Sequence, residues 1–339
     1  MENNKKNIKV SVIVVTYNQE KTIARTLDSI LLQKVKIPYE IIIGDDASTD
    51  STAAICREYE KRYPEIIKVR VNEENKGVLR NYYDCVFSAE GEYISDIAGD
   101  DFWINEEKLQ RQTDILDSDI TISLVHTDWK YYNEETGNLT SPWGNKGYPY
   151  KECMELENLP EFLLQHNNPV PVHLSTSMYR KSFFMEVYQE LPEFFDGDKI
   201  PFEDLQLIIL LATKGGFIYT DIPTLAYSQH EKSITGVNDY TKLFDFYYWS
   251  MEVTHGLELR LEIPHERLID MYKRFSHYIA MQAFHGEDRV RLEKIKTGLK
   301  KWDIEPLQTT KIILFLSKNK LIWKISHCML KFFRKILKK

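Results

Sequence analysis

Two adjacent carboxylates, Asp100 and Asp101, end a short apolar run that begins at Glu92. Neighbouring aspartates repel each other, so holding them close is costly unless a cation lies beside them. Hard oxygen ligands on a tight loop suit Mg²⁺ or Mn²⁺, in particular a metal ion that is shared with phosphate oxygens. The same pair would also suit a turn and a helix cap, and an isolated Asp-Asp pair does not decide between these two readings.

Strands that alternate with helices must position these carboxylates. The continuous β-branched run at Lys9–Val15 and the run at Tyr39–Gly44 are typical of strands that are buried on both faces of a parallel sheet, and Ile66–Val71 is a third expected strand. A helical pattern follows each of them, and the run from Glu92 is the fourth strand. This alternation indicates βαβ units and a mostly parallel sheet, which places the chain in the α/β class.

Polar clusters stand where three of these strands end. In open α/β sheets, ligands bind beyond the carboxyl ends of the strands. We therefore expect three clusters to converge on one rim: Thr16-Tyr17-Asn18, Asp45-Asp46 and Asp100-Asp101. Polar side chains in three corresponding positions favour a functional site over three unrelated turns.

The composition limits the class of protein. The 339 residues are 43% hydrophobic and 28% charged, which is ordinary for a folded chain of about two domains or one domain with an extension. A net charge of -7 argues against general nucleic-acid binding. With no apolar signal segment and no long apolar run, we expect the chain to stay in the cytoplasm. Neither a zinc site nor a disulfide framework is indicated by the widely spaced Cys56, Cys85, Cys153 and Cys328.

Four motifs in order resemble those of family 2 glycosyltransferases of the GT-A fold. They are Val12-Ile13-Val14-Val15-Thr16-Tyr17-Asn18, Asp45-Asp46-Ala47-Ser48-Thr49-Asp50, Asn75-Lys76-Gly77 with Arg80-Asn81, and Gly99-Asp100-Asp101. The resemblance is strong from Ile8 to Gln112, continues loosely to Gly236 and then fades; the family carries Gly where Ala47 stands. It implies a Rossmann-like, mostly parallel sheet with flanking helices, and a nucleotide-sugar donor, most often a UDP-sugar.

The resemblance also implies roles for the rim residues. Asp101 resembles a direct ligand of Mn²⁺ or Mg²⁺, Asp100 a ribose contact, and Asp46 the aspartate that hydrogen-bonds the base. A divalent cation has a clear task here, because charge builds on the diphosphate leaving group and a Lewis acid stabilises it. Arg80 would also fit an exposed helix cation without a ligand. The other nucleotide-binding positions implied are Thr16, Tyr17, Asn18, Lys76, Arg80 and Asn81.

A second acidic pair, Glu203-Asp204, opens an apolar helix expected from Leu205 to Thr213. The helix dipole favours an acid there, so a helix cap is one reading. An inverting transferase needs one carboxylate to take the proton from the acceptor hydroxyl. Asp204 resembles that catalytic base, and Glu203 is the second candidate. On an expected strand beside the acceptor, His173 and Arg180 either face the site or satisfy local hydrogen bonds.

The stretch from Ala226 to Thr235 resembles the closing loop of the family. In that loop His230 would approach the metal and the diphosphate, while Lys232 and Ser233 would reach phosphate oxygens. Such a loop is expected to order on donor binding and to exclude water. Relatives often have Arg where Ser228 stands, so one phosphate contact is missing or supplied elsewhere.

The last hundred residues show a helical pattern rich in aromatics, which is typical of helix packing. We expect a catalytic domain at 1–237, a helical extension at 238–317 and a basic amphipathic tail helix at 318–339. With Trp323 and Phe333 near the apolar side, such a tail is typical of an interfacial membrane anchor; docking on its own domain or on a second subunit is the alternative. One face of the tail carries Leu321, Ile325, Met329, Phe332 and Ile336.

The resulting hypothesis is a metal-dependent inverting glycosyltransferase of the hexosyltransferase type. It would act in cell-surface polysaccharide synthesis on a glycan or lipid-linked acceptor, peripherally on the inner face of the membrane if the tail anchors it. One rival is a sugar-phosphate nucleotidylyltransferase, but Thr16 to Lys21 lack the Gly-rich basic loop that it requires. The other is a non-catalytic scaffold that binds nucleotide or membrane, against which Asp46, Asp101 and Asp204 argue.

Overall fold

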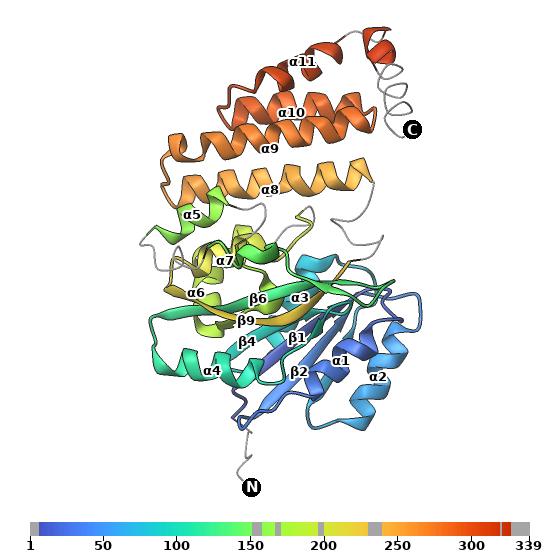
Figure 1. Ribbon diagram of the computed structural model, residues 1–339, viewed down its shortest axis with the longest axis vertical. Coiled ribbons are helices and arrows are strands. Elements are labelled where there is room, and N and C mark those ends of the chain that lie inside the picture. The colour runs from blue at the N-terminus through green and yellow to red at the C-terminus, as the bar shows by residue number, and fades with distance from the viewer. Residues whose placement is uncertain are drawn as a thin grey trace. The chain divides into compact units, whose positions relative to one another are not determined.

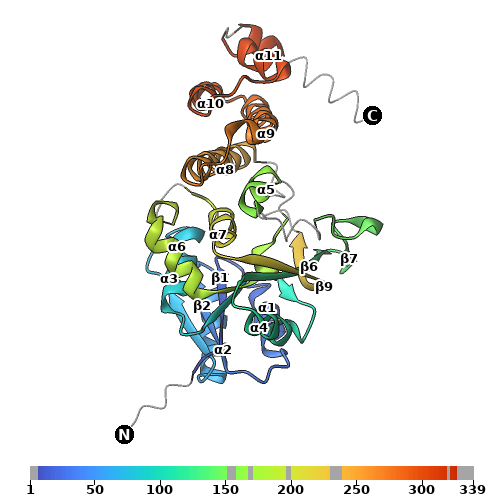
Figure 2. The same cartoon turned by 90° about the vertical axis from the view of Figure 1, so that its left-hand side faces the viewer.

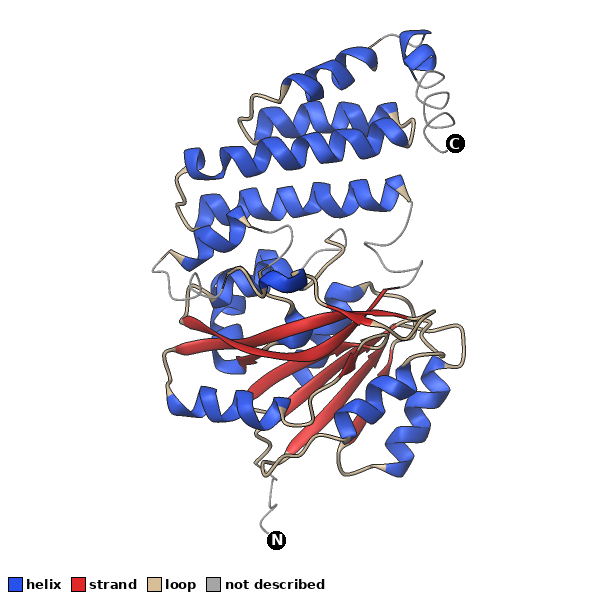
Figure 3. Ribbon diagram, viewed as in Figure 1, coloured by secondary structure: helices blue, strands red, loops and turns tan. Residues whose placement is uncertain are grey.

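The computed structural model describes residues 7–150, 158–166, 171–195, 200–229, 239–318 and 321–326. The chain divides into two compact units, Met1–His230 and Glu231–Lys339 (Figure 1). Among the described residues, all strands belong to the first unit, as the red ribbons of Figure 3 show. The candidate rim residues also lie in this unit, so its sheet decides whether they meet.

Four parallel strands form one half of the sheet. They are β1 (Val10–Thr16), β2 (Tyr39–Asp45), β3 (Ile67–Val71) and β4 (Tyr93–Ala98), in the spatial order β3-β2-β1-β4. The register pairs Thr16 with Asp45 and Val15 with Ala98, so the three polar clusters begin at the same edge. The predicted α/β class with a GT-A-like arrangement is confirmed.

Antiparallel strands extend the sheet beyond β4. The short strand β8 (Met178–Arg180) pairs with β4 and with β6 (Ile122–Asn133), and β9 (Gly216–Gln229) runs parallel to β6. The edge strand β5 (Phe102–Trp103) follows the Asp100-Asp101 turn and pairs with β9. A hairpin joins β6 to β7 (Leu139–Thr140), with Gly137 in its turn at φ 70°.

Helices cover both faces of the sheet (Figure 2). On one face, α1 (Ile23–Leu31), α2 (Thr52–Arg62) and α4 (Lys108–Ser118) share a core with the strands. Their apolar residues recur at helical spacing, as Ile23, Leu27 and Ile30 do in α1, and that stripe is buried. On the other face, α3 (Val78–Ser88) packs on β1 and β2.

The first unit is completed by α5 (Leu159–Gln165), α6 (Lys181–Glu190), α7 (Asp204–Leu211) and short 3₁₀ turns. In the second unit, the described residues form α8 (Tyr240–Arg260), α9 (His265–His285), α10 (Arg289–Lys301) and α11 (Gln308–Leu316). The carboxylates of Asp239 and Asp288 cap α8 and α10. None of the described helices combines the length and apolar composition that a bilayer crossing requires.

Candidate functional site

Asp46 holds the loop of residues 72–77 against the end of β2. Its amide donates to Thr16 O at 3.0 Å, which ties the ends of β1 and β2 together. Its carboxylate is only 4% exposed and accepts from the Lys76 and Gly77 amides at 2.8 and 2.9 Å, and from Asn72 Nδ2 at 2.8 Å. A carboxylate with several donors is fixed in direction, so Asp46 is a rigid part of the rim.

The loops after β1 and β2 also hold each other. The Asn18 amide donates to Ser48 Oγ at 2.9 Å, and Asn18 Oδ1 accepts from the Thr49 amide at 2.8 Å. Ala47 in this loop has φ +59°, a left-handed conformation that a Cβ atom disfavours. That conformation gives a physical reason for the glycine that the family form carries at this position.

The first turn of α1 fixes the backbone of the Gly99-Asp100-Asp101 turn. Thr22 Oγ1 donates to Gly99 O at 2.9 Å, Arg25 Nη2 to Asp100 O at 3.0 Å, and Thr26 Oγ1 to Asp101 O at 2.6 Å. Three consecutive carbonyls are therefore held by one helix. Gly99 is required by close approach, because a Cβ there would lie 2.9 Å from Thr16 Cβ, which sits next to the backbone and cannot swing away.

Sequence reasoning missed the roles of Thr22, Arg25 and Thr26. Their spacing was a usable signal, since residues three and four apart lie on one side of a helix. Thr26 is fully buried although it is polar, and a buried hydroxyl needs a partner.

Arg25 connects this turn to two distant segments. Its guanidinium donates to Ser228 Oγ at 3.1 Å and to both carboxylate oxygens of Glu134, at 2.6 and 3.1 Å. The rings of Phe102 and Tyr132 lie 4.4 and 5.0 Å from its Cζ atom. A cation thus contacts Ser228, the position where relatives often carry Arg.

Asp101 is a buried acid at the rim whose carboxylate is only half satisfied by hydrogen bonds in the described structure. It is 2% exposed, and its Oδ1 accepts from the Ser228 amide at 2.8 Å. Its Oδ2 is buried and has no hydrogen-bond partner within the described part of the chain. Burial, and then the neighbouring charge of Asp100, raise the pKa of Asp101 well above its ordinary value. An unpaired buried carboxylate oxygen costs roughly 1–3 kcal/mol, so it calls for a cation or a donor.

Other buried polar atoms without partners among the described residues gather at the same strand ends. They are Thr16 Oγ1, Gln19 Oε1 and Asp45 Oδ2; Asp96 Oδ1, which also has no partner there, lies inside β4. Burial raises the pKa of Asp96 to about 7, and the charge of Asp204 adds to that rise. Buried polar atoms are nearly always satisfied in folded proteins, so this concentration marks the rim as a place for a polar ligand.

A divalent cation fits Asp101. Its Oδ2 is a hard, anionic, buried oxygen, which suits Mg²⁺ or Mn²⁺. Within the described ranges, no three His, Cys, Asp or Glu side chains gather as a complete metal cage. The protein would therefore hold the ion through few ligands and share it with a phosphate group. His230, the second predicted ligand, lies outside the described residues, as do Lys232 and Ser233.

Glu203 and Asp204 stand at the start of α7. Burial, followed by the charge of Asp204, raises the pKa of Glu203 to about 8. Burial also raises the pKa of Asp204, while the Leu205 amide donates to its Oδ1 at 2.7 Å. Tyr83 Oη donates to Glu203 O at 2.8 Å, which ties this pair to α3.

Helix α3 links the acidic pair to the nucleotide-binding positions predicted at the rim. In the same helix as Tyr83, Asn81 donates from Nδ2 to Gly44 O at 2.8 Å and accepts from Asn72 Nδ2 at 3.0 Å. Lys76 pairs with Asp84 at 2.9 Å, and both Tyr17 and Arg80 are exposed. Helix α3 therefore contacts both the acidic pair that contains the predicted catalytic base and the loop that is predicted to bind the nucleobase.

One predicted residue, Arg180, lies away from the rim, and a second, His173, packs among aromatic side chains. Arg180 is buried at the opposite end of β4 from Asp101, paired in register with Tyr93, and donates to Ile122 O and Asp119 O at 2.8 and 2.9 Å. The structure does not bring it to the rim. Burial lowers the pKa of His173 to about 4, and its ring packs against Trp129 and Tyr227.

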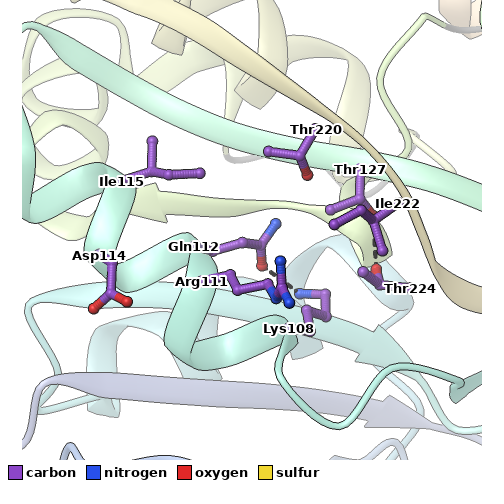
Figure 4. Close-up of a pocket in the computed structure, with 9 residues that line it drawn as sticks. All are labelled: Lys108, Arg111, Gln112, Asp114, Ile115, Thr127, Thr220, Ile222 and Thr224. Carbon is purple, nitrogen blue, oxygen red and sulfur yellow. Dashed lines mark hydrogen bonds between the residues drawn. The ribbon is translucent and has the colours of Figure 1, made fainter.

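A pocket of about 270 Å³ lies between α4 and strands β6 and β9 (Figure 4). None of the predicted site residues lines it. Burial lowers the pKa of Lys108 in its wall to about 7. All three Nζ hydrogens of that lysine are used, on Ser95 Oγ, Gln112 Oε1 and Ser177 O at 2.8, 2.8 and 3.3 Å. Lys108 is therefore occupied within the fold, and the rim is the better candidate site.

The model of glycosyl transferase family 2 matches residues 11–187, which contain β1 to β4, the Asp100-Asp101 turn and β8. The chain belongs to this family. The resemblance seen in the four sequence motifs is thereby confirmed. Membership in the family identifies the chain as a transferase. The rim residues Thr16, Asp46 and Asp101 lie inside the matched region.

Curated relatives of this family 2 transferase match part of the chain. The putative glycosyltransferase EpsE of Bacillus subtilis is 36% identical over 126 residues, which cover 37% of this chain and 45% of EpsE. The poly(ribitol-phosphate) β-N-acetylglucosaminyltransferase TarS of Staphylococcus aureus is 29% identical over 188 residues, covering 55% and 30% of the two chains. An uncharacterized protein of Mycobacterium tuberculosis is 41% identical over 108 residues, 32% and 31% of the two chains. The chain spans less than half the length of each of these relatives.

Solved structures share the fold of this family 2 transferase. S. aureus TarS 1–349 in complex with UDP-GlcNAc superposes with a TM-score of 0.62 at 19% identity, covering 93% of this chain and 88% of that one. The mannosyltransferase PcManGT from Pyrobaculum calidifontis, in complex with GDP-Man and Mn²⁺, gives 0.53 at 14% identity, covering 94% and 83%. Sequence identities this low support a shared fold and no shared activity.

Proposed function

We propose that this chain is a metal-dependent inverting glycosyltransferase that moves a sugar from a nucleotide-sugar donor, a UDP-sugar, to a hydroxyl group. The acceptor would be a glycan or a lipid-linked glycan in the synthesis of a cell-surface polysaccharide. The observation that carries the proposal is the buried Asp101 Oδ2, which lacks a partner in the described structure, at the rim of a family 2 fold. The relatives EpsE, a putative glycosyltransferase, and TarS, an N-acetylglucosaminyltransferase, support the reaction class.

The rim supplies the parts that donor binding needs. The Asp46 carboxylate is fixed in orientation and holds the loop of residues 72–77 in place. The nucleobase of the donor would be recognised there. Thr16 and Asn18 frame the neighbouring loop, and Asp100 follows the tight turn at Gly99. The structural neighbours of this fold were solved with UDP, UDP-GlcNAc or GDP-Man, which supports a nucleotide-sugar donor; the choice of a UDP-sugar follows the family resemblance of the rim motifs.

Asp101 would hold the divalent ion, with its carboxylate oriented by the Ser228 amide. When bound, the ion supplies a Lewis acid that stabilises the charge on the departing diphosphate. Arg25 fixes the backbone of the Asp100-Asp101 turn at Asp100 O and also donates to Ser228 Oγ. Positioning of this kind lowers the barrier because the dipoles need no reorganisation during the reaction.

Asp204 would take the proton from the acceptor hydroxyl while that oxygen attacks the anomeric carbon from the face opposite the diphosphate. The bond to the diphosphate oxygen breaks as the new glycosidic bond forms, so one displacement inverts the configuration. Burial has raised the pKa of Asp204, which makes it a stronger base near neutral pH. Glu203 is the second candidate for this role.

A panel of nucleotide sugars, assayed with Mn²⁺ and with a chelator, tests the proposal. We expect release of the nucleoside diphosphate from one UDP-sugar with the metal, loss of release with the chelator, and an inverted anomeric centre by NMR in the product. Turnover that persists in the chelator contradicts metal dependence. Retention of configuration contradicts a single displacement by one base. No turnover with any donor favours a binding scaffold.

A further inference from the structure

The last described helices expose apolar side chains on one side while they pack with the other. In α11, Ile312 and Phe315 are 57% and 62% exposed, whereas Ile313 and Leu314 are buried. In the helical residues 321–326, Leu321 and Ile325 are 67% and 52% exposed. Their spacings of three and four residues place each pair on one side of its helix. We call Ile312, Phe315, Leu321, Ile322 and Ile325 the basic apolar face.

The helix at residues 321–326 is anchored by Trp323. This side chain is 6% exposed, and its ring lies 5.0 Å from that of Phe284 in α9. The docking alternative therefore holds for Trp323, while the side chains of Leu321 and Ile325 remain more than half exposed. A cluster of exposed apolar side chains within a short stretch marks an interaction surface, unlike apolar residues that are scattered singly.

Charge identifies the kind of partner. The sequence from 306 to 339 contains Lys and Arg but no Asp or Glu, although the chain as a whole has a net charge of -7. Lys318 and Lys324 stand next to the basic apolar face and are exposed. Two copies of the chain meeting through this face would bring like charges together. Apolar side chains flanked by lysines match the boundary between anionic headgroups and acyl chains.

We propose that the basic apolar face binds the surface of an anionic lipid bilayer. Its isoleucine, leucine and phenylalanine side chains enter the headgroup boundary, and the neighbouring lysines pair with lipid phosphates. The contact is peripheral and goes beyond the transfer reaction proposed above without depending on it. Its consequence for a transferase would be to hold the catalytic unit where lipid-linked acceptors are concentrated.

Cosedimentation of the full chain with vesicles tests this proposal. Vesicles of phosphatidylcholine alone are compared with vesicles that also contain phosphatidylglycerol, at low and high salt. We expect binding to the anionic vesicles, weakened by salt and about tenfold weaker or more for the neutral ones. Equal binding to both vesicles, or binding to neither, overturns the proposal.

Paired variants locate the contact. The double substitution Ile312→Ser and Phe315→Ser should lower the partition to anionic vesicles at least roughly tenfold, since two apolar side chains no longer leave water. The matched control is Leu259→Ser with Val290→Ser, which removes apolar side chains that are 65% and 80% exposed in α8 and α10. The control should bind like the wild type.

Two further readouts keep the test decisive. All four substituted positions are exposed, so both double variants should keep the melting temperature of the wild type. If the control loses as much binding as the face variant, the face is not the lipid contact. If the wild type is an oligomer that the face variant dissociates, and neither binds vesicles, the face joins copies of the chain and the lipid proposal is wrong.

Discussion

The Ser228 amide donates to Asp101 Oδ1 at 2.8 Å, across 127 positions of sequence. Strand β9 therefore orients the carboxylate that ends the β4 turn, and only one of the two carboxylate oxygens of Asp101 accepts a hydrogen bond in the described structure. This hydrogen bond explains how the Asp101 carboxylate can be buried and still be held in one orientation. A substitution at Asp101 can therefore remove the negative charge of the side chain while it keeps the hydrogen bond from the Ser228 amide.

Asp101→Asn should abolish metal-dependent binding while it preserves the fold. The amide oxygen can still accept from Ser228, but the anionic oxygen is gone. We expect Mn²⁺ with UDP to raise the melting temperature of the wild type and not that of the variant, since only a bound ligand stabilises. The ligand-free variant should melt at the wild-type temperature or above it, because an unpaired buried charge has been removed. A variant that keeps the metal-dependent rise would contradict this role.

Arg25→Lys tests whether the guanidinium positions the rim. Lysine keeps the charge but lacks the planar fork with which Arg25 makes four hydrogen bonds, to Asp100 O, Ser228 Oγ and both carboxylate oxygens of Glu134. We expect the Kd for UDP with Mn²⁺ to rise roughly tenfold, as loss of hydrogen bonds from a charged group implies. The Kd for UDP without metal should change much less, which a merely structural role would not produce.

Glu134→Gln is the matched control for Arg25. It removes the ion pair but leaves Arg25 able to donate to Asp100 O and Ser228 Oγ. The pair is partly exposed, so its loss should alter stability by less than about 1 kcal/mol. Equal loss of metal-dependent binding in both variants would show that Arg25 acts through its ion pair with Glu134 and not through its hydrogen bond to Asp100 O.

Ala47→Gly should stabilise the protein. A non-glycine residue at φ +59° carries a steric penalty that glycine avoids, and the gain exceeds the added freedom of the unfolded chain. We expect an increase of about 0.5–1 kcal/mol in the free energy of unfolding by urea titration. Ala54→Gly, at an exposed position inside α2, should instead destabilise by a similar amount. Destabilisation by both substitutions would argue against strain at Ala47.

His126→Phe should reduce the sensitivity of the fold to acid. Burial lowers the pKa of His126 to about 3, and neither ring nitrogen has a partner in the described residues. Below the unfolded pKa of about 6.5, the unfolded chain takes up a proton that the folded chain refuses, so stability falls as pH falls. Between pH 7 and 5 the variant should lose about 2 kcal/mol less than the wild type. An unchanged pH dependence would contradict this.

The sheet and its rim were predictable because two simple rules combine. β-branched runs such as Val10–Val15 form buried parallel strands, and their carboxyl ends meet at one edge. The register of Thr16 with Asp45 and of Val15 with Ala98 follows from that pairing. Asp45, Asp46, Asp100 and Asp101 could therefore be placed at one rim from sequence.

Contacts between distant segments were not predictable. The antiparallel β8 takes Arg180 away from the rim, and a pattern of three residues cannot specify the strand beside it. The hydrogen bonds from Arg25 to Asp100 and Ser228 depend on how α1 packs on β5 and how β5 pairs with β9, which periodicity does not encode. That Asp101 Oδ2 is buried without a hydrogen-bond partner in the described residues likewise depends on tertiary packing.

The most direct measurement compares wild type and Asp204→Asn for both donor binding and sugar transfer. If Asp204 takes the acceptor proton, the variant binds UDP and Mn²⁺ with the wild-type Kd while kcat falls by about 10²–10⁴-fold. A variant that transfers sugar at the wild-type rate would contradict the account at its centre.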